Sequence, residues 1–341
     1  KRMITVLITA IGGDIGQGVL KALKLYRKKM RIIGTDITPR APGLFMCDKG
    51  YLVSPAGKGA SAYVSMIIQI CRREKVDIVF CTHEHEQLAL ARNFKKLKKL
   101  KTCFVLQPPA VTFICRDKLK TYKFLSKAGL RVPDTATNRK EIDRLISKFG
   151  FPLVVKSRFG SGSRNFHLAN NKKELNDFLA GTPHPIIQEY IQSDPEEEYT
   201  VGIFLDNKSR ALGAITMLRQ LRFGLTFHAI VDDYPDVTRL AKQTAEILRA
   251  IGLCNVQLRR DSRNQPCVIE VNARISSTVA FRAKLGFNEI AAAIDYFLLH
   301  KKPGLRFKKA VVMKTWDELI ISRADYDLLQ KQSYINKRKK K

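Results

Sequence analysis

Polar side chains that could take part in metal and phosphate chemistry occupy every second position in one stretch of the last third of the chain. Residues 269–274 read IEVNAR, so Glu270, Asn272 and Arg274 alternate with apolar residues. Successive side chains of a strand point to opposite faces. A carboxylate, an amide and a guanidinium would therefore line up on one side of a strand.

A second alternating stretch, Asn255–Leu258, precedes this strand, and residues 261–266 (DSRNQP) between the two are typical of a turn. If the hairpin closes symmetrically, Gln257 lies opposite Glu270. Hard cations such as Mg²⁺ take oxygen ligands and usually keep waters and phosphate oxygens as well. Two interpretations stay open: a magnesium site, or a half-exposed hairpin whose ordinary polar residues face water.

Two upstream segments bear on that choice. The apolar strand Phe151–Lys156 ends in lysine and is followed by a Gly/Ser-rich loop at 159–165 and a strand-like segment. Glycines let backbone N–H groups approach phosphate oxygens, although the P-loop pattern is absent and a plain hairpin is the alternative. Further on, residues 186–191 and 198–203 read as two strands around an acidic loop, for which a solvated turn is the alternative.

Taken in order, these segments resemble the ATP-grasp superfamily, above all the carboxylate–amine ligases related to the large chain of carbamoyl phosphate synthetase. The first of the ordered motifs is Asp117-Lys118, near the start of the ATP-binding region. The resemblance as a whole covers about Ile4 to Leu299. Three residues depart from the family pattern. Gln188 stands where glutamate is common, Ala273 replaces a proline, and Gln257 replaces an acidic metal ligand, although some relatives also use glutamine there.

The resemblance implies ATP and Mg²⁺ (or Mn²⁺) as cofactors, and it implies a role for each matching residue. The expected contacts to ATP come from two lysines, a phosphate loop, a hinge strand and a ribose-binding glutamate: Lys118, Lys156, Gly160, Ser161, Gly162, Ser163, Gln188, Glu189, Tyr190, Ile191 and Glu198. The expected metal ligands are Gln257, Glu270 and Asn272. The neutral Gln257 predicts a weaker second metal site than in all-acidic relatives.

The implied reaction activates a substrate carboxylate as an acyl phosphate, releases ADP, and lets an amine displace phosphate to leave an amide. Arg274 is expected to steady the transferred phosphoryl group. Arg222 is expected to hold the substrate carboxylate or the γ-phosphate, with a solvated basic hairpin as the alternative. The partners are a small-molecule carboxylate and amine, with an acidic peptide or carrier as a further option and a homodimer left open.

The predicted fold class is α/β (α+β), with a Rossmann-like domain followed by a two-lobed ATP-grasp fold. The expected boundaries are 1–109 for the Rossmann-like domain, 110–185 for a linker helix and lid, 186–303 for the nucleotide and metal lobe, and 304–341 for a basic extension. The glycine turn at 12–18 resembles a dinucleotide fingerprint, but the first glycine of that motif falls on Ile11.

The sequence HEHE at 83–86 follows a strand near residues 77–81 and resembles a metal cluster. Successive strand residues point to opposite faces and no third ligand is placed by spacing, so zinc is not expected. Because open α/β sheets bind ligands at such strand ends, Glu84 and Glu86 are candidate substrate-recognition residues.

The formal net charge of +30 is the unusual feature of the composition. It suggests an alternative of another class, a basic nucleic-acid-binding protein with an ATP-grasp fold and no ligase turnover. No nucleic-acid-binding signature supports it, and weak, non-specific binding is the expectation. There is no apolar run of transmembrane length, no signal-peptide pattern and no CxxC among seven scattered cysteines. A cytoplasmic protein with reduced thiols and no membrane partner is expected.

Overall fold

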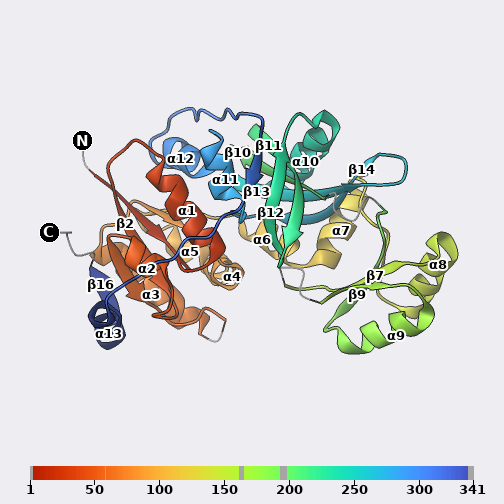
Figure 1. The fold of residues 1–341 in the computed structure, drawn as a ribbon, viewed down its shortest axis with the longest axis horizontal. Coiled ribbons are helices and arrows are strands. Elements are labelled where there is room, and N and C mark those ends of the chain that lie inside the picture. Colours follow the sequence, from red (N-terminus) through yellow and green to blue (C-terminus); the bar gives the residue numbers. More distant parts are fainter. Residues whose placement is uncertain (1–2, 58, 161–164, 193–197, 337–341) are drawn as a thin grey trace.

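The computed structural model describes residues 3–57, 59–160, 165–192 and 198–336. These residues form three sheets with helices packed against them (Figure 1). The predicted α/β (α+β) class is confirmed, with a parallel, Rossmann-like sheet first and two antiparallel sheets after it. No described helix combines the length and the apolar character needed to cross a membrane.

The first sheet has the strand order β16-β3-β2-β1-β4-β5, and β1 to β5 run parallel. These strands are β1 Ile4–Ile8, β2 Met30–Asp36, β3 Lys49–Leu52, β4 Ile78–Phe80 and β5 Cys103–Val105. The helices of this region are α1 Asp14–Lys24, α2 Gly43–Met46, α3 Ala60–Arg73, α4 Glu84–Arg92 and α5 Phe94–Leu97. The chain order reverses between β1 and β4, and ligands of open α/β sheets bind outside the strand ends at such a reversal.

The second sheet forms the lid, with the antiparallel order β6-β9-β7-β8. Its strands are β6 Thr135–Ala136, β7 Leu153–Ser157, β8 Phe166–Ala169 and β9 Pro185–Glu189, and its helices are α8 Arg139–Phe149 and α9 Lys172–Gly181. Leu153 and Val155 pack on one face in a core shared with both helices. Because side chains alternate along a strand, Val154 and Lys156 point to the other face and into a cavity. The strand β9, expected to open the next lobe at residue 186, pairs with the lid.

The third sheet carries the order β14-β13-β10-β11-β12-β15, all antiparallel. Its strands are β10 Glu198–Leu205, β11 Ala211–Arg222, β12 Leu225–Val231, β13 Gly252–Arg260, β14 Pro266–Asn272 and β15 Ala310–Met313. The helices around it are α6 Pro109–Arg116, α7 Lys118–Lys127, α10 Pro235–Ile247, α11 Val279–Lys284 and α12 Glu289–Ala293, the last followed by a π-helical turn at Ile294–Leu298. Apolar side chains of α7, α10 and the sheet share one core, which includes residues of the β13–β14 hairpin.

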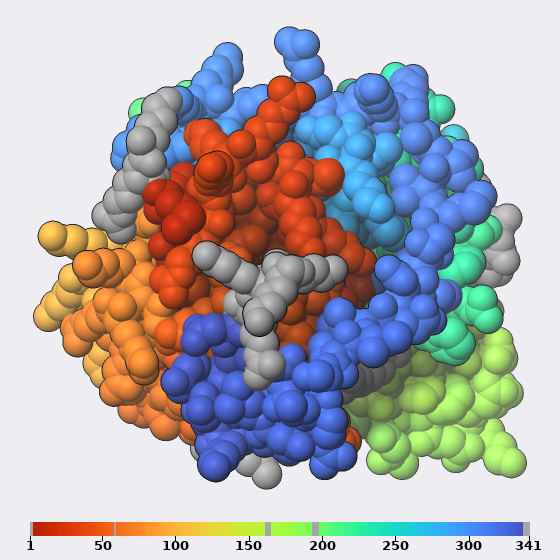
Figure 2. Space-filling view, turned by 60° about the vertical axis from the view of Figure 1, so that its left-hand side comes forward, coloured from red at the N-terminus to blue at the C-terminus, as the bar shows by residue number. Residues whose placement is uncertain are grey.

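The last described segment, 304–336, is built into two sheets. Strand β15 pairs with β12, helix α13 (Arg323–Gln332) follows, and β16 (Tyr334–Asn336) pairs antiparallel with β3. Between them, Nζ of Lys314 lies 2.5 Å from Oδ1 of Asp14 at the start of α1. Figure 2 shows this segment running over the surface beside the N-terminal domain. The segment expected as a basic extension therefore adds one strand to the third sheet and one strand to the first sheet.

Candidate active site

A cavity of about 630 Å³ lies where the three sheets meet. The lid contributes Lys156 and the hinge after β9, the third sheet contributes the β13–β14 hairpin, and the first sheet contributes the turn after β1 and Thr82 after β4. The cavity thus reaches the reversal point of the parallel sheet, which is the position expected for a bound ligand.

The predicted hairpin is confirmed. Gln257 on β13 lies in register with Glu270 on β14, and the register shifts just beyond Gln257. Nδ2 of Asn272 lies 3.3 Å from Oε1 of Glu270, and all three side chains line the cavity. One carboxylate and two amides suit a cation that prefers oxygen. Within the described ranges, no cluster of three or more His, Cys, Asp or Glu residues could hold a metal.

Lys156 faces this hairpin from the lid. Its Nζ donates to the hydroxyl oxygen of Tyr122 at 2.7 Å, and that hydroxyl donates in turn to the carbonyl oxygen of Ile269, beside Glu270. Burial lowers the pKa of Lys156 to about 8, against the opposing attraction of Glu270. A half-buried cation beside the hairpin is well placed to meet a phosphate.

The end of β7 is locked to the start of α7. Asp117 accepts a hydrogen bond from the backbone N–H of Lys120 and two, each at 2.6 Å, from Nε and Nη2 of Arg158. Burial opposes ionisation of Asp117, but the bonds from Arg158 outweigh it and keep its pKa below the usual value. Nζ of Lys118 donates to the carbonyl oxygen of Gly160 at 2.6 Å. The other expected loop residues, Ser161, Gly162 and Ser163, lie outside the described residues.

Two side chains of the hinge segment predicted to bind adenine, those of Gln188 and Glu189, form hydrogen bonds with other residues of the protein. Gln188 donates to the Thr135 hydroxyl at 2.7 Å. The carboxylate of Glu189 accepts from the Arg131 guanidinium and from the Asp134 backbone N–H at 3.0 Å. Both residues still line the cavity, as do Tyr190 and Ile191. Contact to adenine by this segment stays a prediction.

The predicted ribose residue, Glu198, lines the cavity at the start of β10. Its Oε1 accepts from Nε of Arg219 at 3.1 Å and from Nη2 of the same residue, while Nη2 of Arg259 lies 3.8 Å from Oε2. Sequence reasoning missed both arginines. Strand pairing is the feature that would have identified them. Glu198 and Arg219 are register partners, and the pairing of Tyr199 with Leu258 brings Arg259 beside Glu198.

Arg222 lies away from the large cavity. Its guanidinium is exposed and lies 5.4 Å from the ring centroids of Phe223 and Phe227. Arg219 and Leu221 line the large cavity, and Arg222, three positions after Arg219, falls outside this alternation along β11. Arg219 is the arginine of this strand that faces the cavity.

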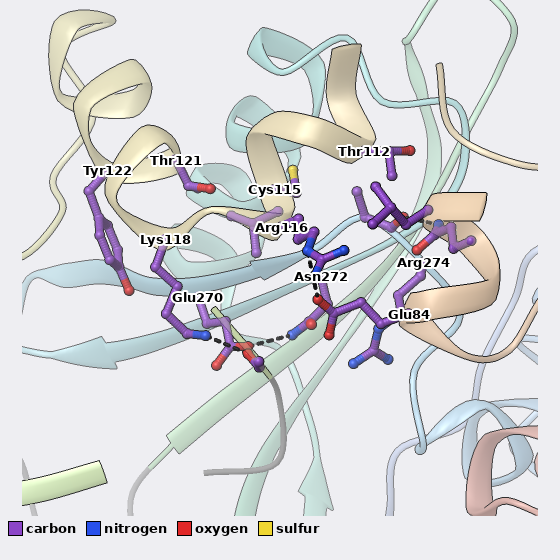
Figure 3. A pocket seen from close by; sticks show the side chains of 15 residues that line it. Glu84, Thr112, Cys115, Arg116, Lys118, Thr121, Tyr122, Glu270, Asn272 and Arg274 are labelled. Carbon is purple, nitrogen blue, oxygen red and sulfur yellow. Dashed lines mark hydrogen bonds and ion pairs between the residues drawn. The ribbon is translucent and has the colours of Figure 1, made fainter. Parts of the chain in front are cut away.

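The two candidate substrate glutamates separate, because HEHE begins a helix and residues two apart on a helix point in different directions. Glu84 lies in a small cleft between α4, α6 and β14, with its Oε1 3.7 Å from Nε of Arg116, as Figure 3 shows. Glu86 is buried, and burial raises its pKa to about 7. Arg274, whose pKa burial lowers, lines both the cleft and the large cavity.

Comparison with known proteins matches both halves of this architecture. A family model described as an ATP-grasp domain covers residues 115–278, and one described as a PylC-like N-terminal domain covers residues 6–105. Residues 115–278 therefore form an ATP-grasp domain, and a PylC-like N-terminal domain precedes it. The family resemblance predicted from the ordered motifs is thereby confirmed.

Two curated relatives are long multifunctional proteins. The chain is 26% identical over 364 residues to multifunctional protein pyr1-3 of Dictyostelium discoideum. That alignment covers 95% of this chain and 16% of the relative. It is 24% identical over 289 residues to multifunctional protein pyr-3 of Neurospora crassa, covering 79% of this chain and 15% of that protein. The chain therefore spans only about a sixth of the length of these relatives.

Solved structures share the fold. N5-carboxyaminoimidazole synthetase from Staphylococcus aureus, complexed with ADP, superposes with a TM-score of 0.72 at 20% identity, covering 92% of this chain and 83% of that one. The L-amino acid ligase from Bacillus licheniformis gives a TM-score of 0.64 at 20% identity, covering 87% and 75%. These matches are in keeping with the predicted ligase class. They lend no support to the nucleic-acid-binding alternative or to a carrier-protein partner.

Proposed function

We propose that this ATP-grasp protein is an ATP-dependent ligase that joins a small-molecule carboxylate to an amine through an acyl phosphate. The observation that carries the proposal is the arrangement inside the large cavity. Lys156 on β7 and Lys118 at the start of α7 line the same cavity as Gln257, Glu270 and Asn272. Cations and oxygen donors in one cavity suit a nucleotide triphosphate with its metal.

Each wall has its own task in that proposal. Gln257, Glu270 and Asn272 would hold Mg²⁺ or Mn²⁺, which supplies charge neutralisation to phosphate oxygens when bound. Lys156 and Lys118 bring further positive charge to the phosphates. Phosphoryl transfer is catalysed mainly by positioning and charge neutralisation, so this chain needs few residues that exchange protons.

The acceptor would enter from the side of the parallel sheet. There the cavity is lined by Gly13 after β1, Thr82 and His83 after β4, and Arg274 after β14. A carboxylate oxygen attacks the γ-phosphorus while the bond to ADP breaks, and Arg274 balances charge on the transferred group. The amine then attacks the carbonyl carbon, loses a proton, and expels inorganic phosphate, which leaves an amide.

The proposal is tested by measuring ADP release with pools of amino acids and dipeptides, followed by mass spectrometry of the products. We expect Mg²⁺-dependent ADP release with a new amide mass. Glu270→Gln should abolish that release because it removes the one carboxylate of the metal face, whereas Gln257→Glu should keep activity and tighten divalent binding.

The matched control is Glu318→Gln, which neutralises an exposed glutamate far along the C-terminal segment and should leave turnover unchanged. Turnover by Glu270→Gln close to that of the parent would reject the assigned metal face. Absence of nucleotide binding by the parent in calorimetry would reject the proposed function as a whole.

A further inference from the structure

A second, smaller pocket of about 290 Å³ adjoins the nucleotide cavity. Arg219, Arg222 and Arg259 line it together with Glu198 and Phe227. Two of the arginines and the glutamate also line the large cavity, so the two spaces share a wall. No role in the proposed ligase reaction uses these three guanidinium groups.

Strand pairing brings the charged groups together. Glu198 opens β10 and is the register partner of Arg219 on β11. On its other side, β10 pairs with β13 through Tyr199 and Leu258, which brings Arg259 beside Glu198. The row Arg259, Glu198, Arg219 therefore crosses three neighbouring strands, and Arg222 adds a third guanidinium at the end of β11.

The positive charge of this row exceeds what its glutamate can pair. Oε1 of Glu198 is taken by Arg219, whose Nη1 also donates to the Thr226 hydroxyl at 3.1 Å. Nη2 of Arg259 lies 3.8 Å from Glu198 Oε2, which is too long for a hydrogen bond. Nε of Arg259 is buried without a partner in the described part of the chain.

An arginine with unused donors beside other guanidinium groups is costly, because buried polar groups need partners and like charges repel. A planar guanidinium fork matches the oxygens of a phosphate or carboxylate. A water molecule takes about 30 Å³, so the pocket has room for such a group and part of the molecule that carries it.

We propose that Arg219, Arg222 and Arg259 form an oxyanion subsite that binds the phosphate or carboxylate group of a second ligand while a nucleotide occupies the larger cavity. The inference rests on the proposed function only in taking the larger cavity as the nucleotide site. It predicts that one ligand of this protein is anionic at a point separate from the carboxylate that reacts.

The test is calorimetric titration of the full chain with inorganic phosphate and, separately, with succinate, each with and without saturating ADP. We expect at least one of the two anions to bind with similar affinity in both conditions, and their ratio distinguishes a phosphate from a carboxylate ligand. Arg259→Gln should weaken that binding about tenfold or more, since it removes charge-assisted hydrogen bonds. Arg222→Gln, at a residue that lines only the smaller pocket, should also weaken anion binding, and the affinity of this variant for ADP should change by less than about threefold.

The matched control is Arg263→Gln, which removes the same charge from the exposed turn between β13 and β14 and should bind the anion as the parent does. The proposal is overturned if neither anion binds, if ADP displaces the anion, or if Arg259→Gln binds it like the parent. Displacement by ADP would mean that the three arginines serve the nucleotide's own phosphates. Failure to bind ADP would reject the proposed function but leave this test of the pocket readable.

Discussion

At the scale of single residues, Lys156 has the most unusual environment in the candidate site. It is half-buried on β7, its ammonium group donates to Tyr122, and its pKa is lowered to about 8 by desolvation. A lysine of this kind is charged at neutral pH and loses its proton at a pH where an exposed lysine would keep it. An anionic ligand that meets the ammonium stabilises the charged form and raises its pKa.

Because nucleotide binding raises the pKa of Lys156, we predict that the affinity for a nucleotide falls as pH rises. Below pH 8 the free protein already carries the proton, so affinity should be constant there. Above about pH 8 binding must take up a proton, and the affinity for ADP should drop by up to tenfold per pH unit until the pKa of the bound state is passed. Calorimetric titrations with ADP at pH 7, 8 and 9 measure the effect.

Lys156→Arg supplies the control, because an arginine keeps its charge across this range. Its affinity for ADP should vary much less between pH 7 and pH 9. An equally steep fall in Lys156→Arg would show that another group carries the pH dependence.

At the scale of elements, a buried ion pair joins α11 and α12 to the β13–β14 hairpin. Nη1 of Arg282 lies 3.2 Å from both carboxylate oxygens of Glu289, and its Nη2 donates to Oδ1 of Asn255 on β13. Asn255 lines the cavity and is the register partner of Asn272. A Cβ on Gly202 would lie 2.1 Å from Arg282 Nη1, so β10 needs glycine where the guanidinium passes.

Removing one partner of this pair should be costly. Arg282→Met would leave the carboxylate of Glu289 buried and unpaired, and we expect a loss of about 3–5 kcal/mol in the free energy of unfolding. The double variant Arg282→Met with Glu289→Leu should be less destabilised than Arg282→Met alone, because no charge stays buried. Urea unfolding followed by circular dichroism measures both. A single variant that loses less than about 1 kcal/mol would contradict this role, since surface substitutions already reach half that value.

At the scale of the whole molecule, two features stand out: the C-terminal segment that ties the sheets together and the net charge of +30. The ion pair of Lys314 with Asp14 joins residues 300 positions apart and lies between the strands that the segment adds to two sheets. The charge is spread along the chain and ends in the run 337–341 (KRKKK), whose residues lie outside the described part.

The charge predicts weak nucleic-acid binding without sequence preference. Its affinity should fall steeply with salt because it rests on counterion release. Deleting residues 337–341 should weaken it and flatten its salt dependence while ADP release stays unchanged, since the deletion spares every residue that lines the cavity. Fluorescence titrations of labelled DNA and RNA at several salt concentrations measure the binding. Sequence-selective binding at nanomolar affinity without turnover on any carboxylate–amine pair would instead favour the nucleic-acid alternative.

Much of the candidate site could be predicted from the sequence because its signals are local. The alternation in 269–274 and the turn at 261–266 predicted a hairpin with Gln257 opposite Glu270, and the register agrees. The apolar strand that ends in Lys156 and the glycines after it likewise predicted a strand, a loop and a strand. Periodicity and turn chemistry act over a few residues, so a single chain displays them.

Only the tertiary structure decided which side chains meet across distant strands. Strand β3 at Lys49–Leu52 is short, and β15 lies at a sheet edge, so neither carries a strong pattern. The face of β11 that lines the cavity carries Arg219 and not Arg222, and a helix in place of a strand end separated Glu84 from Glu86. The sequence by itself determined the resemblance to the ATP-grasp family, the order of the motifs along the chain and the hairpin that sets Gln257 opposite Glu270. Packing between segments tens to hundreds of residues apart decided the ion pairs, the arginine pocket and the integration of the C-terminal segment, because such contacts leave no periodic trace in either segment alone.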